Sequence, residues 1–153
     1  MNEADTRATY IDPALKKAGW GEVEGSRIRR EFPITKGRLI GGGKRSNPDY
    51  ADYVLQYRNR NLAVVEAKRD EHDYTEGLSQ AKDYAERLQV RYTYSTNGLQ
   101  IYGADMAQGS EGDVESYPSP QELWEMTFAE EDSVNKEAGQ WRDKFHTVPF
   151  EDR

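Results

Sequence analysis

Apolar positions recur along this chain with two different periods, and each period predicts a type of element. Residues 2–18 carry apolar side chains at a spacing of three to four, which predicts a helix that ends at Gly19. Pro13 lies inside this segment and predicts a kink or a break into two short helices. Over residues 23–33 apolar and charged positions alternate, which predicts a charged strand.

The apolar centre of the chain predicts a hairpin. Two runs rich in β-forming residues, 50–57 and 61–68, flank the short polar segment 58–60. Residues 62–65 are apolar at every position. We therefore expect an interior strand there, covered on both faces of the sheet.

The second half of the chain predicts a helix and another hairpin. Residues 73–89 have apolar positions spaced by three and four, which predicts a helix. Residues 91–96 and 99–102 predict a hairpin around the turn signal Asn97-Gly98. The order of helices and strands predicts an α/β domain whose central mixed β-sheet is flanked by helices.

The C-terminal part of the chain is charged and rich in turn signals. Pro118 and Pro120 interrupt the chain before an expected helix that carries Leu123, Trp124 and Phe128. Residues 129–153 are charged with a few aromatic side chains. We therefore expect one domain over residues 1–128 and a charged helix or tail over residues 129–153.

The composition excludes several classes of protein. The 153 residues include no cysteine, so disulfides, thiolate zinc sites and cysteine nucleophiles are excluded. No run of roughly 18 apolar residues, as a membrane span requires, is present. The N-terminus lacks the layout of a secretory signal. We therefore expect a cytoplasmic protein without a membrane partner.

The net charge of −7 hides a strong asymmetry along the chain. Residues 26–45 hold seven basic side chains and one acid, a net +6, whereas residues 105–137 hold ten acids and one lysine, a net −9. The glycine-containing loop 36–45 therefore offers cations to a phosphate backbone, with Lys44 and Arg45 as candidate DNA contacts. A basic loop of this kind also occurs simply as a solubilising segment.

Two carboxylates and a lysine are expected to converge at one end of the central hairpin. The second strand ends in Glu66-Ala67-Lys68, and the alternation of side chains places Glu66 and Lys68 on one face. Asp52 on the preceding strand approaches Glu66 if the two strands pair antiparallel across the turn. Carboxylates are ligands for Mg²⁺, which keeps several waters and binds substrate phosphate.

This arrangement suits phosphodiester hydrolysis. Asp52 and Glu66 would hold the metal, the carbonyl of Ala67 would supply a further oxygen, and the metal would lower the pKa of a bound water. Lys68 would steer the attacking water or stabilise the pentacovalent state. The competing interpretation is a solvated ion pair at a strand end. Asp49 is the alternative to Asp52, although a position inside a strand fixes a carboxylate better than a loop does.

Several motifs follow one another in a recognisable order from about residue 2 to residue 128. They lie within residues 2–20 (NEADTRATYIDPALKKAGW), 51–55 (ADYVL), 62–68 (LAVVEAK), 80–85 (QAKDYA), 94–98 (YSTNG) and 117–124 (YPSPQELW). In these motifs and their order the chain resembles the N-terminal part of the restriction (R) subunit of type I restriction-modification enzymes.

The resemblance implies a PD-(D/E)xK nuclease domain that cuts double-stranded DNA with Mg²⁺. Asp52 and Glu66 would then be metal ligands and Lys68 the catalytic lysine. Gln80 and Tyr84 match a Gln-x-x-x-Tyr motif of such nucleases and would contact DNA or support the site, or else pack without a functional role. Glu3 on the first helix would add an acidic group near the metal, or else act only as a capping charge.

The R subunit also carries ATP-driven motor domains, and nothing in this chain matches a phosphate-binding loop for ATP. ATP would therefore act only through motor domains absent from this chain, to which residues 129–153 would lead. The resemblance also implies the modification and specificity subunits as partners. The alternative function is a catalytically silent DNA-binding or docking module with the same fold.

Overall fold

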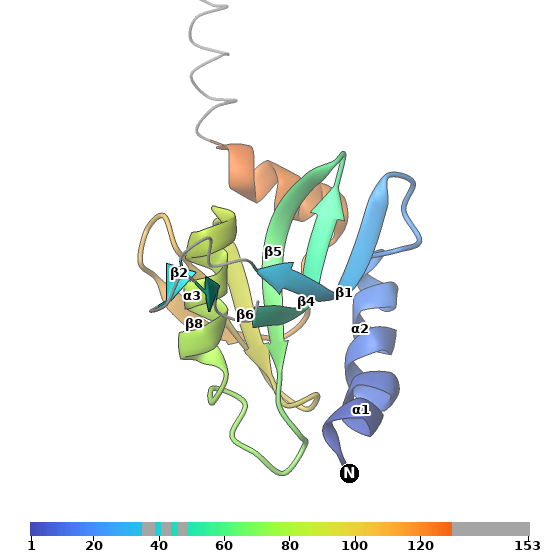
Figure 1. Cartoon of the computed structure of the whole chain (residues 1–153). Coiled ribbons are helices and arrows are strands. Elements are labelled where there is room, and N and C mark those ends of the chain that lie inside the picture. The colour runs from blue at the N-terminus through green and yellow to red at the C-terminus, as the bar shows by residue number, and fades with distance from the viewer. Residues whose placement is uncertain (35–38, 41–43, 46–48, 130–153) are drawn as a thin grey trace, which may run out of the picture.

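A six-stranded mixed sheet forms the centre of the computed structural model, which describes residues 1–34, 39–40, 44–45 and 49–129 (Figure 1). The strand order is β1-β4-β5-β6-β7-β8, and in this sheet only β5 and β6 pair in parallel. The strands are β1 (Ser26–Ile34), β4 (Asp49–Tyr57), β5 (Arg60–Ala67), β6 (Tyr92–Thr96), β7 (Ile101–Asp105) and β8 (Glu111–Val114). The predicted α/β architecture with a mixed sheet is confirmed.

Helices cover both faces of this sheet (Figure 1). On one face lie α1 (Glu3–Thr6), α2 (Asp12–Ala18) and a helix over residues 120–129. Their buried side chains, which include Leu15 and Leu123, pack against Tyr53 and Val65 of the sheet. On the other face α3 (Leu78–Leu88) packs through Tyr84 and Ala85 against Val54 and Val64. The sheet therefore separates two apolar clusters.

The predicted interruption of the first helix is a π-helical turn. Residues Arg7–Ile11 form this turn between α1 and α2, and the N–H of Asp12 donates to the carbonyl of Arg7. Pro13 lies in the first turn of α2, directly after this π-helical turn. Gly19 ends α2 in a left-handed conformation at φ 111°, as predicted.

The central hairpin also forms as predicted. Strands β4 and β5 pair antiparallel, and Arg58 and Asn59 make the turn with φ values of 52° and 64°. Positive φ at both central residues is the conformation of the tight turns that suit twisted strands. Residues 62–65 are buried in β5, which lies between β4 and β6. The prediction of an interior strand is therefore confirmed.

The helix predicted over residues 73–89 is shorter than expected. It begins at Leu78, because the preceding residues form a turn in which Asp73 accepts hydrogen bonds from the N–H and hydroxyl of Thr75. Tyr74, which belongs to the predicted apolar stripe, instead donates its hydroxyl to Asp113. Local bonds at Asp73 and a tertiary bond at Tyr74 thus replace the first helical turns.

The second hairpin differs in its connection. Thr96 pairs with Ile101, so four residues rather than two join β6 to β7. The Asn97 side chain accepts from the N–H groups of Leu99 and Gln100, which stabilises this wider loop. The acidic stretch that follows also contains β8, a strand that the polar pattern of the sequence did not predict.

Two further features complete the described part of the fold. Strands β2 (Leu39–Ile40) and β3 (Lys44–Arg45) pair as a separate two-stranded sheet. Within the described ranges no helix has the length and hydropathy needed to cross a membrane. Of the charged stretch expected over residues 129–153, residue 129 belongs to the helix over residues 120–129, and residues 130–153 lie outside the described residues.

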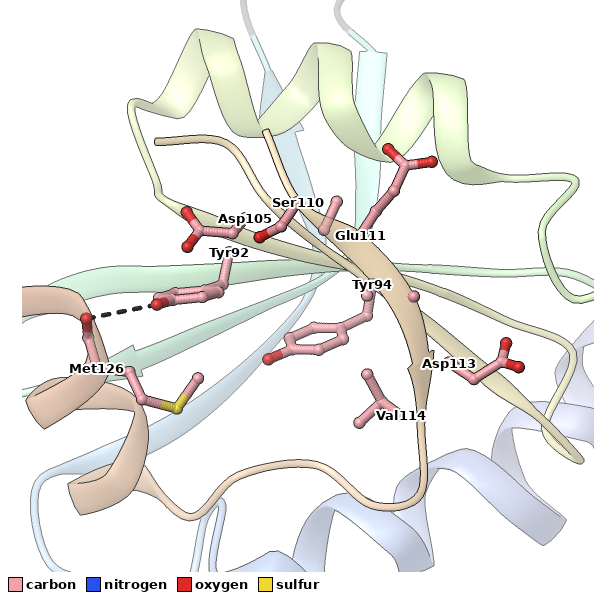
Figure 2. Close-up of a pocket in the computed structure, with 11 residues that line it drawn as sticks. Tyr92, Tyr94, Asp105, Ser110, Glu111, Asp113, Val114 and Met126 are labelled. Atoms are coloured by element: carbon pink, nitrogen blue, oxygen red, sulfur yellow. Dashed lines mark hydrogen bonds between the residues drawn. The ribbon is translucent and has the colours of Figure 1, made fainter. Parts of the chain in front are cut away.

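Gly103 of β7 lies in a tightly packed part of the sheet, on the face shown in Figure 2. A Cβ on Gly103 would lie 2.8 Å from Val114 and 3.0 Å from Tyr94, whereas a Cβ on Gly112, its partner in β8, would meet nothing within 4 Å. Gly103→Ala should therefore cost about 1–3 kcal/mol of unfolding free energy. The control Gly112→Ala should stay within about 0.5 kcal/mol of the parent in urea unfolding. Equal stability of the two variants would contradict this packing.

Candidate active site

Strands β4 and β5 separate at the end of the hairpin away from its turn. Their backbone pairing ends at Tyr53 and Val65. Beyond this pair, the Glu66 carboxylate accepts the N–H of Asp52 at 2.7 Å through Oε2. The Asp52 carboxylate in turn accepts the N–H of Ala67 at 2.8 Å through Oδ2. The Asp52 and Glu66 carboxylates thus accept hydrogen bonds from backbone N–H groups that no longer pair with the other strand. These bonds hold both carboxylates at the point where the strands diverge.

Strand β4 changes course at this point, while β5 continues beside β6. Glu66 and Ala67 still pair with β6, and the N–H of Lys68 donates to the Thr96 carbonyl at 2.8 Å. In β4, however, Ala51 packs in the α3 cluster and Tyr53 in the opposite cluster. Strict alternation would place residues two apart on one face. The alternation is therefore broken at Asp52.

Burial sets the protonation of the two carboxyls. Glu66 is only 3% exposed. Desolvation, and then the neighbouring Asp52, raises the pKa of Glu66 to about 8. Burial also raises the pKa of Asp52, although the Ala67 N–H and Arg7 oppose this. Because negative charge is disfavoured here, a cation bound between the two groups would be stabilised.

Arg7 is the nearest cation that the structure shows at Asp52. Its Nη2 donates to Asp52 Oδ1 at 2.6 Å and to Glu3 Oε1 at 2.7 Å, and its Nη1 donates to Glu31 Oε1 at 2.7 Å. The sequence patterns did not single out Arg7. The only available signal is the spacing of four between Glu3 and Arg7, which is typical of an ion pair on a helix.

The two acidic residues whose role was open occupy different surroundings. Glu3 reaches the site through Arg7, and its charge contributes to the raised pKa of Asp52. Asp49 instead forms an ion pair with Arg87 of α3 at 3.2 Å. The carboxylate that meets Glu66 is therefore that of Asp52, as expected. The expectation that Asp49 lies in a loop was wrong, because Asp49 begins β4 and pairs with Ile34 of β1.

Lys68 lies on the same face as Glu66, as predicted. Its positive charge opposes the rise in the pKa of Glu66, although burial dominates. A Cβ on Gly77, just before α3, would lie 3.3 Å from Glu66 Cβ and 3.7 Å from Lys68 Cε. The Gly77 N–H donates to the Ser95 hydroxyl. Gly77 and Ser95 thus border the site. The sequence patterns assigned no role to either residue, although Ser95 lies in the motif of residues 94–98.

Gln80 and Tyr84 form one hydrogen-bonded pair on α3. Gln80 Nε2 donates to the Tyr84 hydroxyl at 2.7 Å. Gln80 is exposed, whereas the ring of Tyr84 is buried in the α3 cluster with Val64. Burial raises the pKa of Tyr84, and the nearby charge of Glu66 adds to this effect. The pair therefore connects the solvent-exposed side of α3 to the surroundings of Glu66.

The basic loop predicted as a DNA contact is only partly described. The backbone of Lys44 and Arg45 forms β3, but their side chains lie outside the described part of the chain. Residues 36–38 and 41–43 of the same loop also lie outside it.

A pocket of about 250 Å³ lies between β6, β7, β8 and the helix over residues 120–129 (Figure 2), and neither Asp52 nor Glu66 lines it. The rings of Tyr92 and Tyr94 line it, and the Tyr92 hydroxyl donates to the Met126 carbonyl at 3.4 Å. None of the candidate site residues lines this pocket.

Asp52 and Glu66 are the carboxylates that could hold a cation where the strands diverge. The described residues contain no group of three or more histidine, cysteine, aspartate or glutamate side chains placed to hold a metal. Asp52 and Glu66 form a pair whose pKa values are raised first by burial and then by neighbouring negative charge, which a cation would offset. Mg²⁺ commonly binds through one or two carboxylates and completes its shell with water and phosphate oxygens.

Comparisons with known proteins identify relatives over most of the chain. A sequence profile of the family described as the second domain of the type I restriction enzyme EcoKI endonuclease subunit matches residues 31–121. The type I restriction enzyme EcoAI endonuclease subunit of Escherichia coli is 34% identical over 136 residues, which cover 82% of this chain and 16% of that protein.

A solved structure supports the same relationship. It is a fragment assigned to the HsdR subunit of a type I restriction enzyme from Vibrio vulnificus YJ016, with a TM-score of 0.77 and 38% identity. The match covers 86% of this chain and 26% of that one. This chain therefore spans a minor part of the length of both relatives.

Fold and site together define an α/β protein of the nuclease-like type, with a mixed sheet and paired carboxylates where the central hairpin diverges. The chain belongs to the family of type I restriction enzyme endonuclease subunits, and the matching profile is that of a single domain of such a subunit. The resemblance noted in the sequence motifs is confirmed.

The buried carboxyl of Glu66 predicts that stability falls as the pH rises from about 5 to 8. Its pKa is about 8 in the folded state, against an ordinary value of 4.5. In this range the folded state keeps a proton that the unfolded state has lost, so the unfolded state binds fewer protons and rising pH destabilises the fold. In Glu66→Gln the free energy of unfolding should fall between pH 5 and pH 8 by at least about 1 kcal/mol less than in the parent. Urea unfolding of both proteins at about pH 5 and about pH 8 measures this difference. The same decrease in the variant as in the parent would contradict the role of Glu66.

Proposed function

We propose that this chain is a Mg²⁺-dependent endonuclease domain of a type I restriction enzyme and hydrolyses phosphodiester bonds of double-stranded DNA. The observation that carries the proposal is the meeting of Asp52 and Glu66 where β4 and β5 diverge, with Lys68 beside them. Family membership supports it, since the matched relatives are endonuclease subunits.

In this proposal Asp52 and Glu66 hold the cation, and the carbonyl of Ala67 at the end of β5 adds an oxygen. When bound, Mg²⁺ would supply a Lewis acid for the phosphate and lower the pKa of a bound water. Lys68 would orient the attacking water or stabilise the charge that develops on the phosphate.

The surroundings of the site have supporting roles in the proposal. Burial of Tyr84 and its bond to Gln80 would fix one wall of the site, and Gln80 is exposed enough to contact DNA. Lys44 and Arg45 remain proposed phosphate contacts. Glu3 would act through Arg7, with which it is paired.

The proposal also includes the rest of the enzyme. Residues 1–128 would be the nuclease domain, and residues 129–153 would lead to motor domains that use ATP. Modification and specificity subunits would complete the assembly in the cytoplasm. The matched relatives are several times longer than this chain, which supports its being one part of such a protein.

A catalytically silent DNA-binding or docking module is the second candidate. One contact favours it: the guanidinium of Arg7 already occupies Oδ1 of Asp52 at 2.6 Å. A silent module, however, has no need for Lys68 beside the two carboxylates.

The decisive variant is Lys68→Ala in the complete assembly. Loss of one well-placed charge typically lowers a rate by about 10²–10³, so Mg²⁺-dependent cleavage of plasmid DNA should fall by at least about 100-fold. The control Lys82→Ala removes a lysine of α3 that pairs with Glu111 and not with Asp52 or Glu66. This variant should cleave DNA like the parent. ATP hydrolysis by the assembly, measured in parallel, should be unchanged in both variants. Full cleavage by Lys68→Ala would refute the catalytic assignment.

A further inference from the structure

Arg7 binds three carboxylates from three different parts of the fold. It lies on the π-helical turn and contacts Glu3 of α1, Glu31 of β1 and Asp52 of β4. Its side chain is 22% exposed and that of Asp52 is 15% exposed, so the contact between them is partly shielded from water. Partial burial strengthens such a charged contact relative to a surface pair.

The backbone of Glu31 is adapted to this contact. Its φ is 50°, which is uncommon for a residue other than glycine and occurs here inside a strand. The register of β1 with β4 pairs Arg30 with Tyr53 and Phe32 with Ala51, and no pair is formed at Glu31. The interruption in β1 thus lies opposite Asp52, and Glu31 reaches Arg7 from there.

Arg7 has partners that do not depend on Asp52. Nη1 is bound to Glu31, and Nη2 is shared between Glu3 and Asp52. The Nε atom is buried and has no hydrogen-bond partner. If Nη2 gave up Asp52, the guanidinium would still hold two ion pairs and would not become a buried unpaired charge, which is the expensive outcome.

The charged side chains around Asp52 carry a formal excess of negative charge that a divalent cation could neutralise. Glu3, Glu31, Asp52 and Glu66 face Arg7 and Lys68, so full ionisation leaves a formal surplus of two negative charges. Arg7 offsets part of the charge of Asp52 in the structure as it stands. A divalent cation at Asp52 and Glu66 would supply the remaining charge and would repel Arg7.

We propose that Arg7 is the exchangeable counter-ion of Asp52: it positions this carboxylate in the metal-free protein and moves onto Glu3 and Glu31 alone when a divalent cation binds. The inference rests on the proposed metal site at Asp52 and Glu66. Arg7 is a positioning residue in this account, since it acts through Asp52. It ties metal binding to the packing of α1 and β1 around the site.

Arg7→Gln tests the proposal by metal affinity. Removal of the competing charge should tighten Mg²⁺ binding by the 153-residue chain about tenfold in titration calorimetry. Arg7→Lys keeps the charge and should stay within about threefold of the parent. The matched control Arg91→Gln removes an arginine that forms an ion pair with Asp105 at 2.9 Å outside the site, and it should leave Mg²⁺ affinity unchanged.

The outcomes separate this inference from the proposed function. Mg²⁺ binding by the parent with equal or weaker binding by Arg7→Gln would overturn the counter-ion role and leave the metal site standing. Binding by Arg7→Gln but not by the parent would support the counter-ion role. Binding by neither protein would overturn both.

A second measurement covers the case in which Arg7→Gln does not fold. The Arg7 side-chain N–H resonances of the parent should shift on addition of Mg²⁺ in a nitrogen–proton NMR spectrum, because the contact with Asp52 is released. The same resonances in Asp52→Asn should not respond. Unchanged Arg7 resonances in a parent protein that binds Mg²⁺ would overturn the exchange.

Discussion

The site depends on the point at which β4 leaves β5. If backbone pairing continued past Tyr53 and Val65, the N–H groups of Asp52 and Ala67 would not be open to carboxylates. Instead each strand offers an N–H to the other strand's acid, at 2.7 and 2.8 Å. This reciprocal exchange satisfies the freed donors and fixes both carboxylates, which is why an interior strand can end in a charged site.

The electrostatic properties of the site follow from this geometry. Burial raises the pKa values of the two neighbouring acids, while the charge of Arg7, which contacts Asp52, and that of Lys68, which acts on Glu66, oppose this rise. Raised pKa values of this kind favour protonated carboxyls or, under the proposed function, a bound cation. The π-helical turn and the positive φ of Glu31 are local irregularities that bring Arg7 and its partners to the same place.

The sequence predicted those parts of the fold and site that depend on local patterns. Apolar residues 62–65 identified the interior strand, and antiparallel pairing with the preceding run placed Asp52 near Glu66. Arg7 was not predicted, because its role depends on contacts with Glu31 and Asp52, which are 24 and 45 residues away. The polar strand β8 and the turn before α3 were missed because tertiary hydrogen bonds, such as that from Tyr74 to Asp113, outweigh local propensity there.

Under the proposed function, the diverging ends of β4 and β5 form one cation site. Crystals of the chain soaked in Mn²⁺, a cation that resembles Mg²⁺ in its preference for oxygen ligands, test this by anomalous scattering. One strong anomalous peak is expected within about 2.0–2.3 Å of carboxylate oxygens of both Asp52 and Glu66. A peak elsewhere, or none at these carboxylates at a saturating Mn²⁺ concentration, would contradict it.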